Sequence, residues 1–190
     1  VVAKLSSTQM GTLTTAQVVS LTQAQALQLT TQQTVGLSAT QIGALETADL
    51  VKLSTDAFAA IRSDAITGLS SAQVSALTTA QVVSLTQTQA GVLTTQQTVG
   101  LSVTQAPKVE DGDLSSLTTD AFAGLTPESV SKLTSSQVSR LRAEELKALT
   151  TAQAAALTAD QTVGITTSQV SLLENDDLAS LTTGAFAAVA

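Results

Sequence analysis

The sequence predicts an all-α solenoid, a superhelix of very short capped helices with one helix for every eight residues. Three observations support this fold class. From Leu5 to Val189 every eighth residue is Leu, Ile or Val, which gives 24 aliphatic anchors in unbroken register. The residues that follow each anchor carry the signal for a helix start. A period of eight also cannot continue as one helix, because the anchor would move about 80° round the axis at each repeat.

The pattern inside each eight-residue unit, here called an octad, predicts where its helix begins. With the anchor as position 1, position 2 is Ser or Thr in 18 of the 23 complete octads, and position 5 is Gln, Asp or Glu in 18. Ser or Thr followed three residues later by Gln or Glu is a capping box, and positions 1 and 6 then form the hydrophobic staple. We expect a helix of one to one and a half turns, a corner near positions 8 and 1, and a new cap.

The apolar positions predict how such short helices are held. Position 6 is apolar in 20 octads and is Thr in three, Thr34, Thr98 and Thr162, each with Val next to it. Helices this short are unstable alone in water, so positions 1 and 6 must pack into a shared apolar seam. A buried Leu contributes roughly 1.5–3 kcal/mol and a cap about 1 kcal/mol. The alternative is a β-solenoid, because Thr and Val favour strands, although positions 1 and 6 differ in parity.

A second period of 64 residues, or eight octads, runs above the octad. We therefore expect one repeat array over residues 1–190, with super-repeats at about 5–68, 69–132 and 133–190. The super-repeat suggests one geometric turn of the coil, or one pair of stacked layers, in which Phe fills a recurrent wider gap. The features spaced by 64 are Phe58, Phe122 and Phe186 at position 6, Gly36, Gly100 and Gly164 at position 8, and Glu46, Glu110 and Glu174 at position 2.

Pro107 marks the least regular place in the array, since it lies at position 7 just before an octad that contains Gly112. Proline removes a backbone donor and restricts the residue before it. The sequence predicts a kink or loosened turn around residues 106–113, with faster hydrogen exchange there than in residues 77–100.

Composition excludes several functional classes. The formal charge is −7, and the eight Lys and Arg residues are scattered, so we expect no nucleic-acid partner. No apolar run approaches the roughly 20 residues of a membrane span, so we expect no membrane insertion. His and Cys are absent, which removes the usual general bases, thiol nucleophiles and zinc ligands. We expect no enzyme, no catalytic residues, no cofactor and no metal site.

Two recurrent features are the candidate binding sites. Acidic clusters recur at 46–49, 110–113 and 174–177, and carboxylates grouped on a turn could hold Ca²⁺, which takes six to eight oxygens. The favoured interpretation is that acidic groups at a helix start replace the Ser/Thr cap, because the first cluster has only two carboxylates. The three Phe residues could form a recognition stripe, but their position 6 elsewhere holds core aliphatics.

The octad Leu-(Ser/Thr)-x-x-Gln-(Val/Ile)-x-x, as in residues 77–84, resembles the short Leu-Thr-x-x-Gln repeats of very large bacterial extracellular or surface proteins of the adhesin and exoprotein type. The resemblance covers the whole chain. It implies a spacer, fibre or matrix role outside the cell or on its surface, with no catalytic residues to carry over.

These observations favour a non-catalytic structural segment that forms a rod, stalk or filament. The alternative is a solenoid binding module for a protein, a glycan or Ca²⁺. Val1 is at position 5 of its octad and Ala190 at position 2, so two more residues would join one copy to the next in register. Self-association, end to end or lateral, is therefore the expected partnership.

Overall fold

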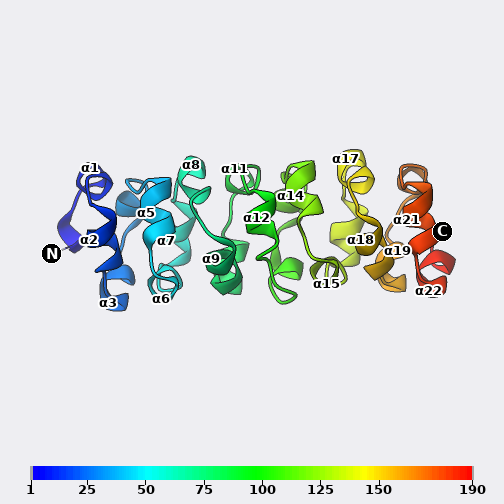
Figure 1. Ribbon diagram of the computed structural model, residues 1–190, viewed down its shortest axis with the longest axis horizontal. Coiled ribbons are helices and arrows are strands. Elements are labelled where there is room, and N and C mark those ends of the chain that lie inside the picture. The colour runs from blue at the N-terminus through cyan, green and yellow to red at the C-terminus, as the bar shows by residue number, and fades with distance from the viewer. Residues whose placement is uncertain (1, 190) are drawn as a thin grey trace.

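The computed structural model describes residues 2–189, which form an elongated rod with the two ends of the chain at opposite ends (Figure 1). These residues contain 22 short α-helices and two 3₁₀ helices, with no strand among them. The predicted all-α solenoid is confirmed, and the β-solenoid alternative is wrong for this part of the chain. Val1 and Ala190, whose octad positions suggest that two copies could join in register, lie outside the described residues.

The elements follow one another at octad spacing. In chain order they are η1 (Val2–Lys4), α1 (Ser7–Gly11), α2 (Thr15–Val19), α3 (Gln23–Ala26), α4 (Thr31–Thr34), α5 (Ala39–Ala44), α6 (Thr47–Leu50), α7 (Thr55–Ala59), α8 (Ser63–Ile66), α9 (Ser71–Ala76), α10 (Thr79–Val83), α11 (Gln87–Ala90), α12 (Thr95–Thr98), η2 (Ala106–Lys108), α13 (Asp111–Leu114), α14 (Thr119–Ala123), α15 (Pro127–Val130), α16 (Ser135–Ser139), α17 (Ala143–Lys147), α18 (Thr151–Ala156), α19 (Ala159–Thr162), α20 (Thr167–Val170), α21 (Asn175–Ser180) and α22 (Thr183–Ala187).

Every α-helix begins at position 3, directly after an N-cap at position 2, as the capping pattern predicts. Thr78, for example, has extended backbone angles and accepts the N–H of Gln81, while the Gln81 side chain accepts the N–H of Thr78. The helix ends within four to six residues, and the next anchor N–H donates to the position-6 carbonyl three residues before it, as Leu85 does to Val82 at 3.2 Å. Local hydrogen bonds therefore stop and restart the helix in each octad.

The octads wind into a coil with three octads, or 24 residues, in each turn. Each helix packs against the helices three octads before and after it, as α5 does against α2 and α8, and α18 against α15 and α21. The 64-residue super-repeat is eight octads, which is two turns plus two octads. The interpretation of the super-repeat as one turn or one pair of layers is therefore wrong. Successive super-repeats are instead rotated by about two-thirds of a turn.

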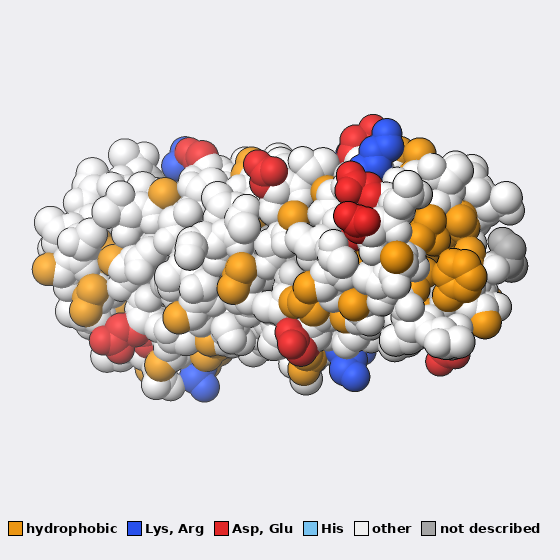
Figure 2. Space-filling model, turned by 45° about the vertical axis from the view of Figure 1, so that its right-hand side comes forward, with side chains coloured by type: hydrophobic (Ala, Val, Ile, Leu, Met, Phe, Trp, Pro, Cys, Tyr) orange, Lys and Arg blue, Asp and Glu red, His pale blue; other side chains and the backbone are white. Residues whose placement is uncertain are grey.

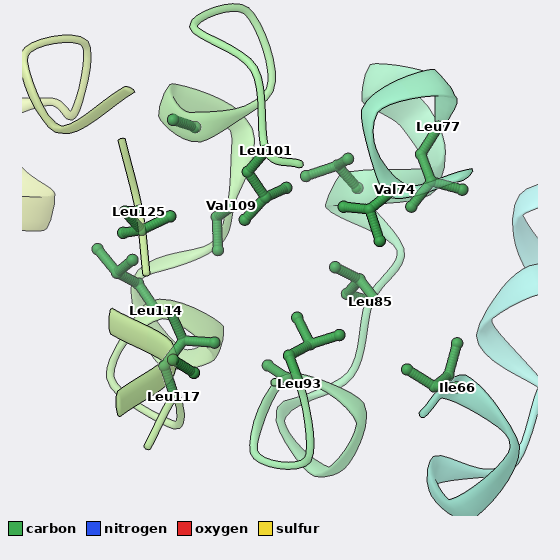
Figure 3. Packing of buried hydrophobic residues seen from close by; sticks show 14 of the residues in the cluster. Ile66, Val74, Leu77, Leu85, Leu93, Leu101, Val109, Leu114, Leu117 and Leu125 are labelled. Carbon is green, nitrogen blue, oxygen red and sulfur yellow. The ribbon is translucent and has the colours of Figure 1, made fainter. Parts of the chain in front are cut away.

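The apolar core is one continuous cluster along the rod axis, from Met10 to Ala185. Anchors such as Leu77, Leu85 and Leu93 point inward from successive sides of the coil, so three octads enclose each layer (Figure 3). Position 6 contributes residues such as Val74 and Leu114. The predicted seam of positions 1 and 6 is confirmed, and position 5 is buried with them from the second turn onward.

The octad that contains Pro107 departs from the others, as the sequence predicts. It forms a turn and the 3₁₀ helix η2 (Ala106–Lys108), with Pro107 in its first turn, in place of an α-helix. Gln105 still faces the interior and bonds to the preceding turn. The irregularity is therefore local, and faster hydrogen exchange at this place stays a prediction.

Three octads end in Thr-Val-Gly, at residues 34–36, 98–100 and 162–164, and their position 6 is polar instead of apolar. Thr98 is fully buried and donates to the carbonyl of Ala121 at 2.6 Å, whereas the neighbouring Val99 is 48% exposed. The position-6 Thr, and not the Val next to it, therefore faces the interior. A small side chain is needed because α12 packs against α14, which carries the fully buried Phe122.

Glycine at position 8 lets adjacent turns approach each other. A Cβ atom at Gly100 would clash with the carbonyl oxygen of Ser71, in the turn before it, and Gly36 is equally close to Ser7. No described residue has a positive φ. These glycines are therefore needed for close packing of backbone on backbone and not for an unusual turn.

Candidate functional site

The most specific feature of the molecule is a ladder of position-5 side chains that join each turn of the coil to the one before it. Gln97 in α12 is representative. Its Oε1 accepts the N–H of its own cap residue Thr94 at 2.9 Å, while its Nε2 donates to the carbonyls of Ile66 and Leu69 at 2.8 and 2.9 Å. One buried amide thus serves as helix cap and as crosslink between turns.

The same crosslink recurs at every position-5 glutamine that has a preceding turn. In each case Nε2 donates to the anchor carbonyl 28 residues earlier, at 2.6–3.2 Å, because 28 residues are three octads plus the four positions from anchor to glutamine. The eleven residues are Gln33, Gln41, Gln73, Gln81, Gln89, Gln97, Gln105, Gln137, Gln153, Gln161 and Gln169.

Two octads make the crosslink with other side chains. Ser129 donates its hydroxyl to the carbonyl of Leu101 at 2.6 Å, again 28 residues earlier. Glu145, which is fully buried, accepts from the backbone N–H and the guanidinium of Arg142, and that guanidinium donates to the carbonyl of Leu117 at 3.1 Å. The Arg142–Glu145 pair therefore replaces the Thr–Gln pair, with arginine supplying the donor. The hydrogen bond to Glu145 raises the pKa of the Arg142 guanidinium and outweighs desolvation.

Three octads carry aspartate at this position, and in them the donor is missing. Asp49, Asp113 and Asp177 are as buried as the glutamines, with 2% of each residue exposed. Their Oδ2 atoms are the buried side-chain polar atoms that lack a hydrogen-bond partner among residues 2–189. The anchor carbonyls 28 residues earlier belong to Leu21, Leu85 and Leu149, and within the same residues they receive no side-chain donor.

Burial changes the acidity of these carboxyl groups. Desolvation, followed by the charge of Glu110, raises the pKa of Asp113 to about 6. Desolvation and Glu46 raise the pKa of Asp49 in the same way. Desolvation also raises the pKa of Asp177, against a hydrogen bond from Thr151 that lowers it. Each aspartate is thus easier to protonate than an exposed one.

The acidic clusters do not converge into a cation site. Glu46, Glu110 and Glu174 are N-caps without a side-chain capping bond, while the aspartates three residues later point into the core. In the described part of the chain no group of three or more His, Cys, Asp or Glu side chains could hold a metal ion. As expected, an acidic residue takes the N-cap position in place of Ser or Thr, but its side chain makes no capping hydrogen bond.

The phenylalanines belong to the core where a following turn covers them. Phe58 and Phe122 are fully buried, as the core interpretation predicts, whereas Phe186 in α22 is 58% exposed, since no later turn lies over it within residues 2–189. A recognition stripe is therefore not formed by the first two rings.

The flanks of the rod carry shallow grooves and scattered charge. One groove, with a volume of about 520 Å³, lies between α7, α10 and η2 and is lined by Thr55, Thr79, Ala80, Val83, Ser84 and Lys108. Figure 2 shows a few acidic and basic side chains over a mostly uncharged polar surface. Among the described residues no helix has the length and hydropathy needed to cross a membrane.

Sequence patterns alone grouped Gln, Asp and Glu at position 5 as equivalent capping residues. The structure separates them, because only glutamine has both an acceptor for its own cap and a donor for the preceding turn. The signal that could have shown this is the large excess of Gln over Glu at position 5, since a capping box accepts either residue.

Comparison with known proteins identifies a repeat region. The ALTTAQ repeat family matches residues 42–79, which span α6 to α9 and the anchors around them. No curated protein matches the chain. The chain therefore contains a repeat segment, and the resemblance to adhesin- or exoprotein-type proteins of bacteria stays an expectation.

Proposed function

We propose that this chain is a non-catalytic structural segment that forms a stiff rod, stalk or filament of a bacterial extracellular or cell-surface protein and that associates end to end through its own repeat. The observation that carries the proposal is the ladder, in which the same crosslink recurs at eleven glutamines between Gln33 and Gln169 along a continuous core. Each turn is tied to the next by hydrogen bonds and apolar packing in a dry interior, which favours stiffness along the axis.

The repeat is self-complementary, which supports end-to-end association, because each turn directs glutamine Nε2 donors at the preceding turn and offers anchor carbonyls to the following one. At the N-terminal end Gln9, Gln17 and Gln25 use Oε1 for their caps, and their Nε2 atoms donate no hydrogen bond within residues 2–189. The anchor carbonyls of Ile165, Leu173 and Leu181 in turn receive no side-chain donor within residues 2–189. Stacking one copy on another would pair these donors with these acceptors at the spacing of the ladder.

The C-terminal face of the last described turn also carries apolar side chains that are buried in earlier super-repeats. Phe186 is exposed and Leu178 is only partly buried, although Leu50 and Leu114, at the same place in earlier super-repeats, are buried. Figure 2, with the C-terminal end turned forward, shows hydrophobic side chains gathered there. Covering this face with another turn of the repeat would remove it from water.

The test is to measure particle shape and assembly in solution. Sedimentation velocity over a wide concentration range and negative-stain microscopy should show rods that lengthen with concentration at constant width. Changing Gln9, Gln17 and Gln25 together to Glu keeps the caps but removes the end donors and adds charge, so it should give single short rods.

The matched control changes three exposed glutamines on the flank, Gln32, Gln87 and Gln96, to Glu. This variant adds the same charge and should still assemble end to end. Strictly monomeric wild-type protein at high concentration would contradict the association, and a compact or flexible particle would contradict the rod itself.

A further inference from the structure

Where position 5 is Ala57, Ala65, Ala121 or Ala185, the ladder has no polar side chain at all. The aspartates at position 5 are the octads in which a buried polar side chain is present but the hydrogen-bond donor is missing. In eleven octads an amide N–H lies between the position-5 side chain and the anchor carbonyl of the preceding turn. In the octads of Asp49, Asp113 and Asp177 the position-5 side chain has only carboxylate oxygens, its Oδ2 is buried without a hydrogen-bond partner, and the anchor carbonyl of the preceding turn receives no side-chain donor within residues 2–189. A buried oxygen without a donor is costly, because it has lost its hydration without replacement.

We propose that Asp49, Asp113 and Asp177 are proton-uptake sites that tighten the solenoid in mildly acidic solution. Each takes up one proton, and the neutral carboxyl group donates its O–H to the anchor carbonyl of the preceding turn, as the glutamine amide does elsewhere. The proton comes from solvent and stays on the carboxyl group, so no other bond forms or breaks. The rod thus has three acid-strengthened joints, one in each super-repeat.

No basic side chain competes for these carboxylates from the helices packed against them. Asp49 lies in α6, against α3 and α9, and Asp177 lies in α21, against α18, and none of these neighbouring helices has a titratable residue. Asp113 lies in α13, against α11 and α16, which also have none.

The charged groups that do lie close favour protonation. Glu46 acts on Asp49, Glu110 on Asp113, and Glu174 with Asp176 on Asp177, and all are acidic. Arg140, which follows the neighbouring helix α16, is paired with Asp111 at 3.0 Å, and no basic residue is among the causes that shift the pKa of Asp113.

The sign of the pH dependence follows from the raised pKa. The folded chain binds more protons than the unfolded chain between pH 3.8 and about 6 at Asp113. The stabilisation is therefore fully present below pH 3.8 and is lost as the pH rises through about 6. The shift corresponds to a change of roughly a hundredfold in the unfolding equilibrium constant at this site. The other two sites act in the same direction.

The experiment is urea unfolding of the 190-residue chain, followed by circular dichroism between pH 4 and pH 8. The wild type should become more stable as the pH falls toward 4. The triple variant D49N/D113N/D177N, whose amides supply the missing donor, should be more stable than the wild type at pH 7 and should lose most of this dependence. The control D56N/D120N/D160N removes three exposed carboxylates and should keep the wild-type profile.

A second measurement does not depend on how the variants fold. Carboxyl ¹³C resonances of the wild type should show three aspartates that titrate above the other aspartates. Normal titration of all of them would overturn the proposal, as would a wild-type stability that is flat or falls between pH 7 and pH 4. Stabilisation by Ca²⁺ or Na⁺ at pH 7 that the triple variant abolishes would also overturn it, in favour of a bound cation.

Discussion

Replacing one ladder glutamine by glutamate isolates the crosslink from the cap. In Gln97→Glu the side-chain length is unchanged, and one carboxylate oxygen can still accept the N–H of Thr94. The other oxygen replaces the amide nitrogen that donates to the carbonyls of Ile66 and Leu69. The variant therefore loses two buried hydrogen bonds between turns, and its carboxylate oxygen repels the two carbonyl oxygens that the amide N–H had bound. The capping bond that starts the helix is retained.

The expected cost is large for a substitution that preserves shape. Two buried hydrogen bonds contribute about 1 kcal/mol each, and an unsatisfied buried group costs about 1–3 kcal/mol. We expect Gln97→Glu to lower the free energy of unfolding by about 3–5 kcal/mol at pH 7, measured by urea unfolding. Part of the lost free energy of unfolding should return at low pH, because a protonated glutamate again has an O–H donor.

Two further variants test whether the loss comes from the crosslink between turns. Gln9→Glu changes a residue with the same capping bond but no preceding turn, so it should cost less than about 1 kcal/mol. The double variant Thr94→Arg/Gln97→Glu copies the Arg142–Glu145 pair, whose arginine donates to the preceding turn, and it should recover much of the loss. If Gln97→Glu and Gln9→Glu lowered the free energy of unfolding equally, the crosslink would not contribute to stability.

Three further outcomes can be checked by the same unfolding assay or by hydrogen exchange. Gly100→Ala should cost about 1–3 kcal/mol, because its Cβ would clash with the preceding turn, whereas Gly184→Ala, with open space around it, should be neutral or slightly stabilising. Phe122→Ala should cost about 3–5 kcal/mol, and the exposed Phe186→Ala much less. Amides around Ala106–Lys108 should exchange faster than those of residues 77–100, and equal protection would contradict the loosened turn.

The sequence by itself determined the features that depend on neighbouring residues. The cap at position 2, the helix start at position 3 and the inward anchors follow from side chains and amides three residues apart, as in Thr78 and Gln81. The irregular octad at Pro107 was predictable for the same reason, since proline acts on its own backbone and that of the preceding residue.

Only the tertiary structure decided how the octads are wound. Three octads in each turn, the burial of position 5, the inward Thr98 with its outward Val99, and the missing donors at Asp49 and Asp113 all depend on residues 23–31 positions apart. A local pattern does not fix which residues meet across that separation, because the angle between successive short helices is set by how their side chains pack. Local capping therefore explains the octad pattern of the sequence. Hydrogen bonding between turns explains why position 5 is so often glutamine.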